Sequence, residues 1–560
     1  MSTNKQSRRA FLTQTTAVAA LGATTATVFG QSSNDEISHA TIAQAEQLAG
    51  IQFSEKEREQ ILRTIEEQHS LFTARMALGD IPNSLSPATV FHPRVPGRTV
   101  HQYTHTGNVR DTLPSAGPCP RSNEELAFAP VWKLSHWMKQ REITSMQLTS
   151  ISLERLKKYG PSLQCVISLT EERALRQAKQ ADAELDAGLY KGPLHGIPWG
   201  AKDIIDTAGD KTTWGAMAYK DRISHDNAFV TQKLEDSGAV LVAKLALGAL
   251  AYGDVWFGGT CKNPFDVHEG SSGSSAGSAC ATAAGLVPFS LGTETYGSIV
   301  SPCMRCGATG LRPTFGRVAR TGVMALCWSL DKIGPICRSV LDTALVLDAI
   351  NGEDAGDPSS VQEPFYFDSS QSAKGIRLGF DPGMMDNKEN KYDLEALYAA
   401  EKSGAILVEA PIPDLDPTVM LIPLLAESAA AFEEFTRSGE DDELVWQDDA
   451  AWPNSFRQAW FIPAIEHIQA SRLRRKMQEQ MHTWMNESFD AFLTPSFSNL
   501  LLLTNGTGHP SLVLRTGMPH GKPTGTTLIG RLFDEGTICR LGMAMESKLD
   551  VSGIRPSFSM

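Results

Sequence analysis

A lysine lies inside an apolar segment of this chain, where a charged residue is costly. Lys202 follows IPWGA and precedes DII in residues 197–205, a composition typical of a buried strand. Burying an unpaired ammonium group is unfavourable by several kcal/mol, so such a lysine is either paired or neutral. Three alternatives follow: a strand edge that exposes Lys202, an ion pair with Asp203, or a buried neutral amine that can act as a base.

Two loops rich in glycine and serine follow this segment. The first, residues 269–278, reads EGSSGSSAGS, and the second, residues 292–298, reads GTETYGS after an apolar strand expected at 286–291. Such turns can aim successive backbone N–H groups at one point, as an oxyanion hole requires. An ordinary strand-ending turn explains the second loop equally well. In the first loop a nucleophile elbow at Ser275 is disfavoured, because no buried strand precedes it.

Apolar segments alternate with helical segments from residue 128 onward. Helices are predicted within 126–159, 278–286, 341–350 and 394–403, and a helix running into a strand over 228–246. Strands are predicted within 192–206, 286–291, 376–380 and 405–408. This alternation predicts an α/β fold with a mixed central sheet that helices cover on both faces.

The first 127 residues have a different composition. Arg8 and Arg9 precede an uncharged stretch rich in alanine and threonine, so residues 1–32 are similar to a twin-arginine (Tat) signal peptide. The expected location is therefore the periplasm or another exported site, with the segment either removed or retained as a membrane anchor. Residues 33–127 are predicted to form a helical extension and a Pro-rich linker, and residues 128–560 one further domain.

Charge and cysteine content disfavour other classes of function. The net charge is −13, so the phosphates of a nucleic acid repel the chain and no nucleic-acid partner is expected. The only close cysteine pair among nine, Cys303 and Cys306, has no second pair at zinc spacing. We therefore expect neither a metal nor a cofactor. Beyond the signal-like segment, no apolar run is long enough to span a membrane.

Several separated segments together resemble the amidase signature family. They are GIPWGAKDIID at 196–206, GSSAGS at 273–278, GTETYGSIVSP at 292–302, GLRPTFGRV at 310–318 and SLDKIGP at 329–335. The resemblance covers about residues 130–545 and implies the amidase signature fold for residues 128–560.

The resemblance also implies a Ser-Ser-Lys catalytic triad. Ser298 matches the nucleophile, Ser274 matches a bridging serine on a cis peptide bond, and Lys202 matches the general base. A serine hydroxyl attacks once a base removes its proton, and a lysine can be that base only when it is neutral. The oxyanion hole of the family matches the backbone N–H groups of Thr295, Tyr296, Gly297 and Ser298.

The chain departs from the family's usual Gly-Thr-Asp-Thr-Gly-Gly-Ser loop. Glu294 replaces Asp, Tyr296 replaces Gly, and Val300 stands where Arg is frequent. These changes affect the expected choice of substrate more than catalysis itself. Further residues that either line a pocket or belong to the structural core are His195, His268, His509, Trp256, Phe257, Trp446, Trp452 and Trp460.

The resemblance implies two alternative functions. The first is an exported serine amidohydrolase that cleaves the C–N bond of a small-molecule or peptide-like amide through an acyl-enzyme. The second is the glutaminase (A) subunit of a Glu-tRNA(Gln)/Asp-tRNA(Asn) amidotransferase, which passes ammonia to a partner protein. The signal-like segment favours the first, because charged tRNA is cytoplasmic. A homodimer is a further hypothesis, in which the N-terminal helices pack on a second copy.

Overall fold

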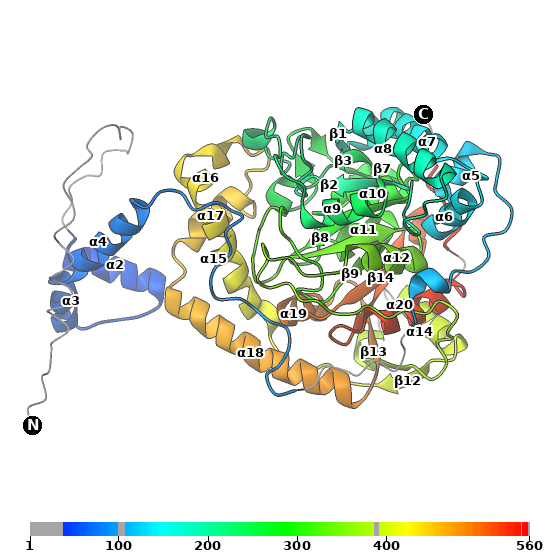
Figure 1. The fold of residues 1–560 in the computed structure, drawn as a ribbon. Helices are drawn as coiled ribbons and strands as arrows, with labels where there is room; N and C mark the ends of the chain where they lie inside the picture. The colour runs from blue at the N-terminus through cyan, green and yellow to red at the C-terminus, as the bar shows by residue number, and fades with distance from the viewer. Residues whose placement is uncertain (1–36, 99–106, 386–390, 550, 558–560) are drawn as a thin grey trace, which may run out of the picture. The chain divides into compact units, whose positions relative to one another are not determined.

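The computed structural model describes residues 37–98, 107–385, 391–549 and 551–557 (Figure 1). Contacts divide the chain into two compact units, residues 1–79 and residues 80–560. This division differs from the expected boundary after residue 127, because residues from Asp80 onward make their contacts within the second unit. The signal-like segment 1–32 lies outside the described residues. No helix in the described ranges is long and apolar enough to cross a bilayer.

Three helices make up the described part of the first unit: α2 (His39–Ala49), α3 (Glu55–Leu62) and α4 (Ile65–Met76). Ser38 and Ser54 each cap a helix, since their side chains accept hydrogen bonds from backbone N–H groups of the first turn. Arg58 of α3 donates to both carboxylate oxygens of Glu46 in α2, at 2.8 and 2.6 Å. The predicted N-terminal helices are therefore present.

A mixed sheet of 11 strands forms the centre of the second unit (Figure 1). β2 runs parallel to its neighbours β3 and β8, whereas β8, β10, β9, β14 and β15 pair antiparallel in succession. In spatial order the strands are β1 (Val166–Leu169), β3 (Val240–Leu245), β2 (Pro198–Lys202), β8 (Phe289–Glu294), β10 (Lys332–Cys337), β9 (Thr309–Arg312), β14 (Ser511–Gly517), β15 (Thr524–Gly530), β13 (Ala491–Pro495), β11 (Arg377–Phe380) and β12 (Ile406–Glu409). Two short hairpins, β4 (Val255–Trp256) with β5 (Gly259–Thr260) and β6 (Lys262–Asn263) with β7 (Asp266–Gly270), lie outside this sheet.

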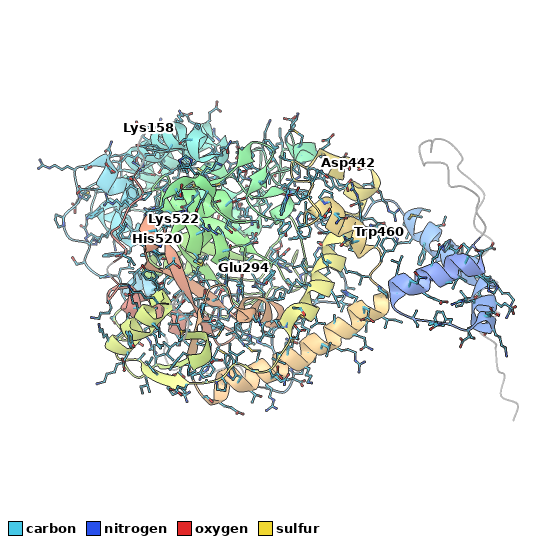
Figure 2. All side chains as sticks on the ribbon, turned by 180° about the vertical axis from the view of Figure 1, so that it is seen from behind. Lys158, Glu294, Asp442, Trp460, His520 and Lys522 are labelled. Atoms are coloured by element: carbon cyan, nitrogen blue, oxygen red, sulfur yellow. The ribbon has the colours of Figure 1, made fainter. Side chains whose placement is uncertain are left out.

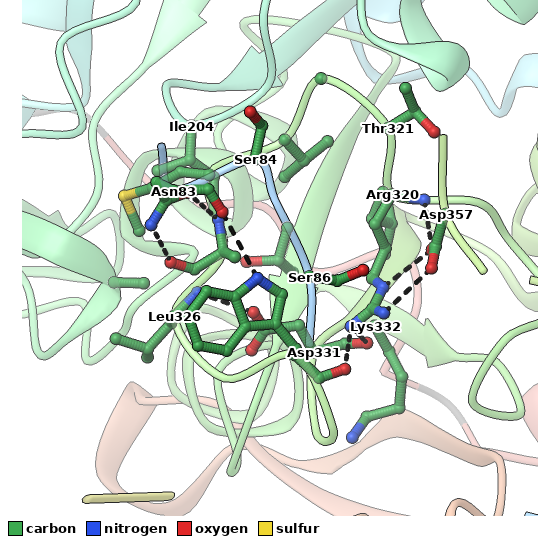
Figure 3. Close-up of a pocket in the computed structure, with 18 of the residues that line it drawn as sticks. Asn83, Ser84, Ser86, Ile204, Arg320, Thr321, Leu326, Asp331, Lys332 and Asp357 are labelled. Carbon is green, nitrogen blue, oxygen red and sulfur yellow. Dashed lines mark hydrogen bonds and ion pairs between the residues drawn. The ribbon is translucent and has the colours of Figure 1, made fainter. Parts of the chain in front are cut away.

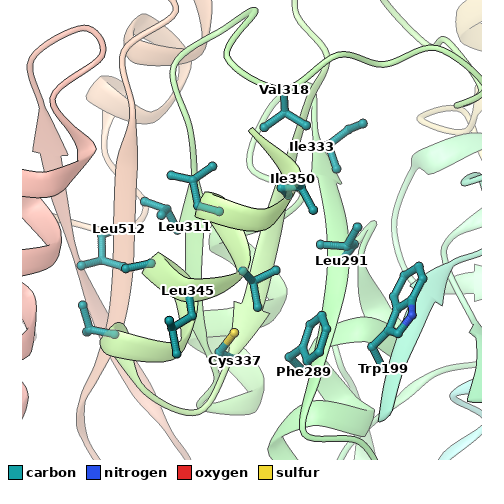
Figure 4. Packing of buried hydrophobic residues seen from close by; sticks show 14 of the residues in the cluster. Trp199, Phe289, Leu291, Leu311, Val318, Ile333, Cys337, Leu345, Ile350 and Leu512 are labelled. Atoms are coloured by element: carbon teal, nitrogen blue, oxygen red, sulfur yellow. The ribbon is translucent and has the colours of Figure 1, made fainter. Parts of the chain in front are cut away.

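Helices cover both faces of this sheet. Phe289 and Leu291 of β8 belong to the buried cluster that includes α12 (Val340–Ile350), part of which Figure 4 shows. Ser290, between them, instead donates to a carbonyl of α10 (Ala276–Ala283) at 2.9 Å. Because successive side chains of a strand point to opposite faces, α12 and α10 lie on opposite sides of the sheet. The predicted α/β architecture is confirmed.

The remaining helices of the second unit connect the strands or pack around them. They are α5 (Asn123–Phe128), α6 (Val131–Lys139), α7 (Ser145–Leu163), α8 (Glu171–Asp186), α9 (Phe229–Asp236), α11 (Val300–Cys306), α13 (Pro382–Met385), α14 (Lys391–Lys402), α15 (Leu421–Ala431), α16 (Glu433–Arg437), α17 (Trp452–Ala459), α18 (Ala464–Glu487), α19 (Asn499–Thr507) and α20 (Glu535–Glu546).

One strand lies further along the chain than predicted. The expected strand at 286–291 is β8, which spans Phe289–Glu294. Gly292, Thr293 and Glu294 pair with the first residues of β10 and extend the ladder, so they do not begin a turn. The loop that follows β8 therefore starts at Thr295.

Candidate active site

Lys202 is the last residue of β2 and is completely buried. Its Nζ atom donates to Ser274 Oγ at 2.9 Å and to Thr293 Oγ1 at 2.7 Å. Burial lowers the pKa of Lys202 to about 7, even though the carboxylates of Asp331 and Glu294 act to raise it. Near neutral pH the amine is therefore available to accept a proton.

Asp203, the next residue along the chain, does not pair with Lys202. Its carboxylate lies 3.2 Å from Nζ of Lys244 in β3, and both side chains are fully buried. Two alternatives for the buried lysine are thus wrong: Lys202 is neither exposed at a strand edge nor neutralised by its neighbour.

The first Gly/Ser loop, residues 269–278, brings Ser274 within hydrogen-bonding distance of the Lys202 amine. The peptide bond between Gly273 and Ser274 is cis, as the family resemblance implies. A side chain at Gly273 would place its Cβ only 1.7 Å from the carbonyl oxygen of Gly253, so the loop can pack here only because residue 273 is glycine. The loop then enters α10, and the backbone N–H of Ser275 donates to the carbonyl of Ser298 at 3.1 Å.

Ser275 fastens the first loop to the end of β8. Its hydroxyl donates to the carbonyl of Thr293 at 3.0 Å and accepts from the N–H of the same residue at 3.1 Å. The three segments that carry Lys202, Ser274 and Ser298 are distant in the sequence. They meet at the C-terminal ends of the neighbouring parallel strands β2 and β8.

The second loop holds Ser298 beside unused backbone donors. Ser298 is 8% exposed, and Gly297 has a φ of 83°, which glycine adopts without strain. The N–H groups of Tyr296, Gly297 and Ser298 donate to no other described residue. Successive backbone donors without a partner are what stabilisation of a developing oxyanion requires. Within the described residues no hydrogen bond joins Ser298 Oγ to Ser274 or Lys202.

Glu294 is fully buried in the second unit and anchors this loop (Figure 2). One carboxylate oxygen contacts Arg312 at 2.5 Å, and the other accepts from the N–H groups of Ile299 and Val300 at 2.8 and 3.0 Å. Burial acts to raise the pKa of Glu294, but Arg312 and these N–H groups lower it to about 2. The carboxylate is therefore charged at neutral pH and fixes the start of α11.

Asp331 holds the second loop through a hydrogen bond with Thr295, a role that the sequence did not reveal. It accepts from Thr295 Oγ1 at 2.6 Å and from the N–H groups of Leu326 and Cys327 at 2.8 and 2.9 Å. Asp331 belongs to the SLDKIGP segment at 329–335, which contributed to the family resemblance. That segment gave no indication that Asp331 contacts Thr295. Thr293, which bonds to Lys202, was also missed.

A cavity of about 80 Å³ adjoins the second loop, residues 292–298 (Figure 3). Thr293 and Thr295 form part of its wall, together with Asp331 and with Asn83 from the segment that precedes α5. Lys202, Ser274 and Ser298 are not on this wall. Thr293 links the wall to Lys202, because its hydroxyl accepts the hydrogen bond from Nζ.

A family model described as Amidase matches residues 147–500, which include both loops and the buried lysine. The chain belongs to the amidase signature family. It is accordingly an amidase signature hydrolase that acts on C–N bonds.

Relatives of this chain include amidotransferase subunits and amidases of known structure. The A subunit of glutamyl-tRNA(Gln) amidotransferase from Chloroflexus aggregans is 32% identical over 474 residues, covering 75% of this chain and 96% of the relative. Its counterpart from Moorella thermoacetica is 29% identical over 487 residues, covering 78% and 100%. The crystal structure of peptide amidase from Stenotrophomonas maltophilia is 27% identical with a TM-score of 0.69, covering 77% of this chain and 99% of that structure.

The departures from the amidase signature loop have distinct surroundings. Tyr296 is 44% exposed, so its phenol borders the approach to the loop. Val300 is buried in α11, where the family often has Arg. The nearby Arg312 does not supply a free positive charge, because Glu294 neutralises it.

None of the other residues considered from the sequence is hydrogen-bonded to Lys202, Ser274 or Ser298 in the described part of the chain. His195 is buried against Glu184 at 3.0 Å, burial lowers the pKa of His509 to about 3, and His268 is exposed on β7. None of the five aromatic residues is on the wall of the cavity; Trp256 and Trp452 are buried, whereas Trp460 is 47% exposed. Cys303 and Cys306 are buried free thiols, and no cluster in the described ranges could hold a metal ion.

Proposed function

We propose that the chain is a serine amidohydrolase that cleaves a carboxamide bond through an acyl-enzyme, with Ser298 as nucleophile. The observation that carries the proposal is the buried amine of Lys202, which has a pKa of about 7 and lies 2.9 Å from Ser274 Oγ. A base of this kind can activate an alcohol at neutral pH without a histidine.

The proposed reaction has two steps, and the hydrogen bond from Lys202 to Ser274 supports the second half of its proton route. Ser298 Oγ attacks the amide carbon while its proton passes to Ser274, whose own proton passes to the neutral Lys202. The N–H groups of the loop stabilise the oxyanion, each well-placed donor contributing about 3–4 kcal/mol. The proton then returns through Ser274 to the leaving amine and the C–N bond breaks. Water, deprotonated by the same route, hydrolyses the ester on Ser298 and releases the acid.

Replacing the nucleophile tests this proposal directly. Ser298→Ala should fold like the wild type and lose at least about 10⁴-fold in kcat on any amide that the wild type cleaves. The assay is release of ammonia or amine from a varied panel of amides, with circular dichroism to confirm the fold. Turnover at the wild-type rate in Ser298→Ala would remove the assigned nucleophile.

The curated relatives favour a second candidate, the glutaminase component of a tRNA-dependent amidotransferase. The two candidates differ in what the chain does alone. A free-standing amidase cleaves simple amides without a partner, whereas the amidotransferase role requires a partner protein to receive ammonia. Including glutamine in the panel separates them: efficient turnover of other amides by the isolated chain supports the amidase, and activity restricted to glutamine supports the amidotransferase component.

We also propose that the chain is exported by the twin-arginine pathway, on the basis of residues 1–32. Replacing Arg8 and Arg9 by Lys should leave the protein in the cytoplasm, because that pathway reads the arginine pair. Fractionation of cells that express each form measures this. Unchanged export of the Lys–Lys form would refute the routing.

A further inference from the structure

Residues 81–98 form a segment without helix or strand, here called the strap, that precedes the region matched by the family model. Its far end is fastened to α18, where Gln478 donates to the carbonyls of His92 and Pro93 at 2.8 and 3.0 Å. The guanidinium of Arg474 lies over the Phe91 ring, 3.3 Å from its centroid. The strap is therefore a fixed part of the second unit.

The near end of the strap is fastened at Asn83. Its side-chain amide donates to the carbonyl of Ala325 at 2.8 Å, and its side-chain oxygen accepts from the N–H of the same residue at 2.8 Å. The indole of Trp328 donates to the backbone carbonyl of Asn83 at 3.3 Å. The Asn83 side chain thus makes two hydrogen bonds to the backbone of Ala325, one as donor and one as acceptor, and these bonds anchor the 324–328 loop to the strap.

This anchored end forms one wall of the cavity beside the second loop. Asn83, Ser84 and Ser86 lie on the wall (Figure 3). Thr293 and Thr295 of the second loop lie on the same wall. The hydroxyls of Ser84 and Ser86 bond to no other described residue, which leaves them available to a ligand. At about 80 Å³ the cavity is roughly half the size of one that holds benzene, about 150 Å³.

The same anchor is linked to the oxyanion loop. The loop that Asn83 holds at Ala325 continues into Leu326 and Cys327, whose N–H groups bond to Asp331. Asp331 in turn accepts from Thr295 at 2.6 Å. A change at the strap can therefore alter both the wall of the cavity and the position of the loop.

We propose that the strap determines substrate specificity: Asn83, Ser84 and Ser86 restrict the acyl group of the amide to a compact one that forms hydrogen bonds. The inference rests on the proposed amidohydrolase function. Small size follows from the volume of the cavity, and polarity follows from the two free hydroxyls on its wall. A site built to bond a hydroxyl or amine rejects an apolar analogue strongly, because its own polar groups are then left unpaired.

Primary amides test the proposal, because they all release ammonia and differ only in their acyl group. Any difference in kcat/KM between them therefore reports recognition of the acyl group. We would compare glycolamide, which is compact and carries a hydroxyl, with phenylacetamide, which is bulky and apolar. In the wild type, kcat/KM should be higher for glycolamide. Asn83→Ala should reduce the ratio of the two kcat/KM values about tenfold, chiefly by raising KM for glycolamide. Leu85→Ala, an exposed strap residue that is not on the cavity wall, should leave the ratio unchanged.

A second variant covers the case in which Asn83→Ala does not fold. Ser84→Ala/Ser86→Ala removes only hydroxyl groups and should reduce the same ratio, with little change in kcat. If the strap had a purely structural role, both variants would lower kcat/KM for the two substrates by the same factor. An unchanged ratio would therefore overturn the inference. A wild type that cleaves no amide would instead contradict the proposed function, so the two failures are distinguishable.

Discussion

Lys202 and Lys244 lie on adjacent parallel strands and are equally buried, yet their partners differ. In β3, Lys244 contacts the carboxylate of Asp203 at 3.2 Å. It also donates to the hydroxyl of Thr212 at 2.6 Å. In β2, Lys202 is within hydrogen-bonding distance of no carboxylate among the described residues, and its main partners are the hydroxyls of Ser274 and Thr293.

The difference shows that the type of partner, more than burial, decides what a buried amine can do. Burial lowers the pKa of both lysines, but at Lys244 a carboxylate in direct contact opposes this effect. A hydroxyl solvates an amine without fixing its charge, and it can itself give or take a proton. Lys202 is therefore suited to act as a base, whereas Lys244 is suited to hold two strands and a loop together.

The largest effect that this comparison predicts is the loss of the base. Lys202→Met should reduce kcat/KM at least about 10⁴-fold, because no other amine in the described part of the chain reaches Ser274. Steady-state kinetics at pH 8 measure this, with thermal melting as a check on folding.

Lys244→Met is the matched control on the neighbouring strand. It leaves the Asp203 carboxylate buried without its partner and should lower the free energy of unfolding by about 3–5 kcal/mol. The folded fraction should nevertheless keep kcat/KM within about tenfold of the wild type. If Lys202→Met stayed active, or if folded Lys244→Met lost turnover to the same degree, the assignment of different roles to the two lysines would be wrong.

A smaller effect is expected when Lys202 receives the kind of partner that Lys244 has. The wild-type kcat/KM should rise with pH through about 7, since only the neutral amine accepts a proton. Thr293→Asp places a carboxylate beside Lys202, which favours the ammonium form and should raise its pKa by about 1–3 units. The rising limb should move to higher pH by that amount.

Thr293→Asn is the control, because asparagine has nearly the shape of aspartate but carries no charge. The rising limb of its kcat/KM profile should stay within about one pH unit of the wild-type limb. Profiles of kcat/KM against pH for the three forms decide the matter. Coincident limbs in the Asp and Asn variants would mean that the titrating group is not Lys202.

The sequence predicted local features well and long-range partners poorly. Apolar segments located five of the 11 strands of the sheet, β2, β3, β8, β11 and β12, and the motif pattern located Lys202 and Ser274. It did not show that Asp203 pairs with Lys244, because only the pairing of β2 with β3 brings these two residues together. Nor did it place Asn83 against Ala325, 242 residues away, since no periodicity reports such a contact.

The ion pair of Glu294 with Arg312 has a consequence for behaviour in acid. Because the pKa of Glu294 falls from 4.5 to about 2, the stability it contributes is complete above pH 4.5 and disappears only as the pH drops towards 2. Lys202 gains its proton near pH 7, well before that point. Between these two limits the ion pair of Glu294 with Arg312 is expected to stay intact while Lys202 is protonated, so activity lost on mild acidification should return when the pH is brought back to neutral.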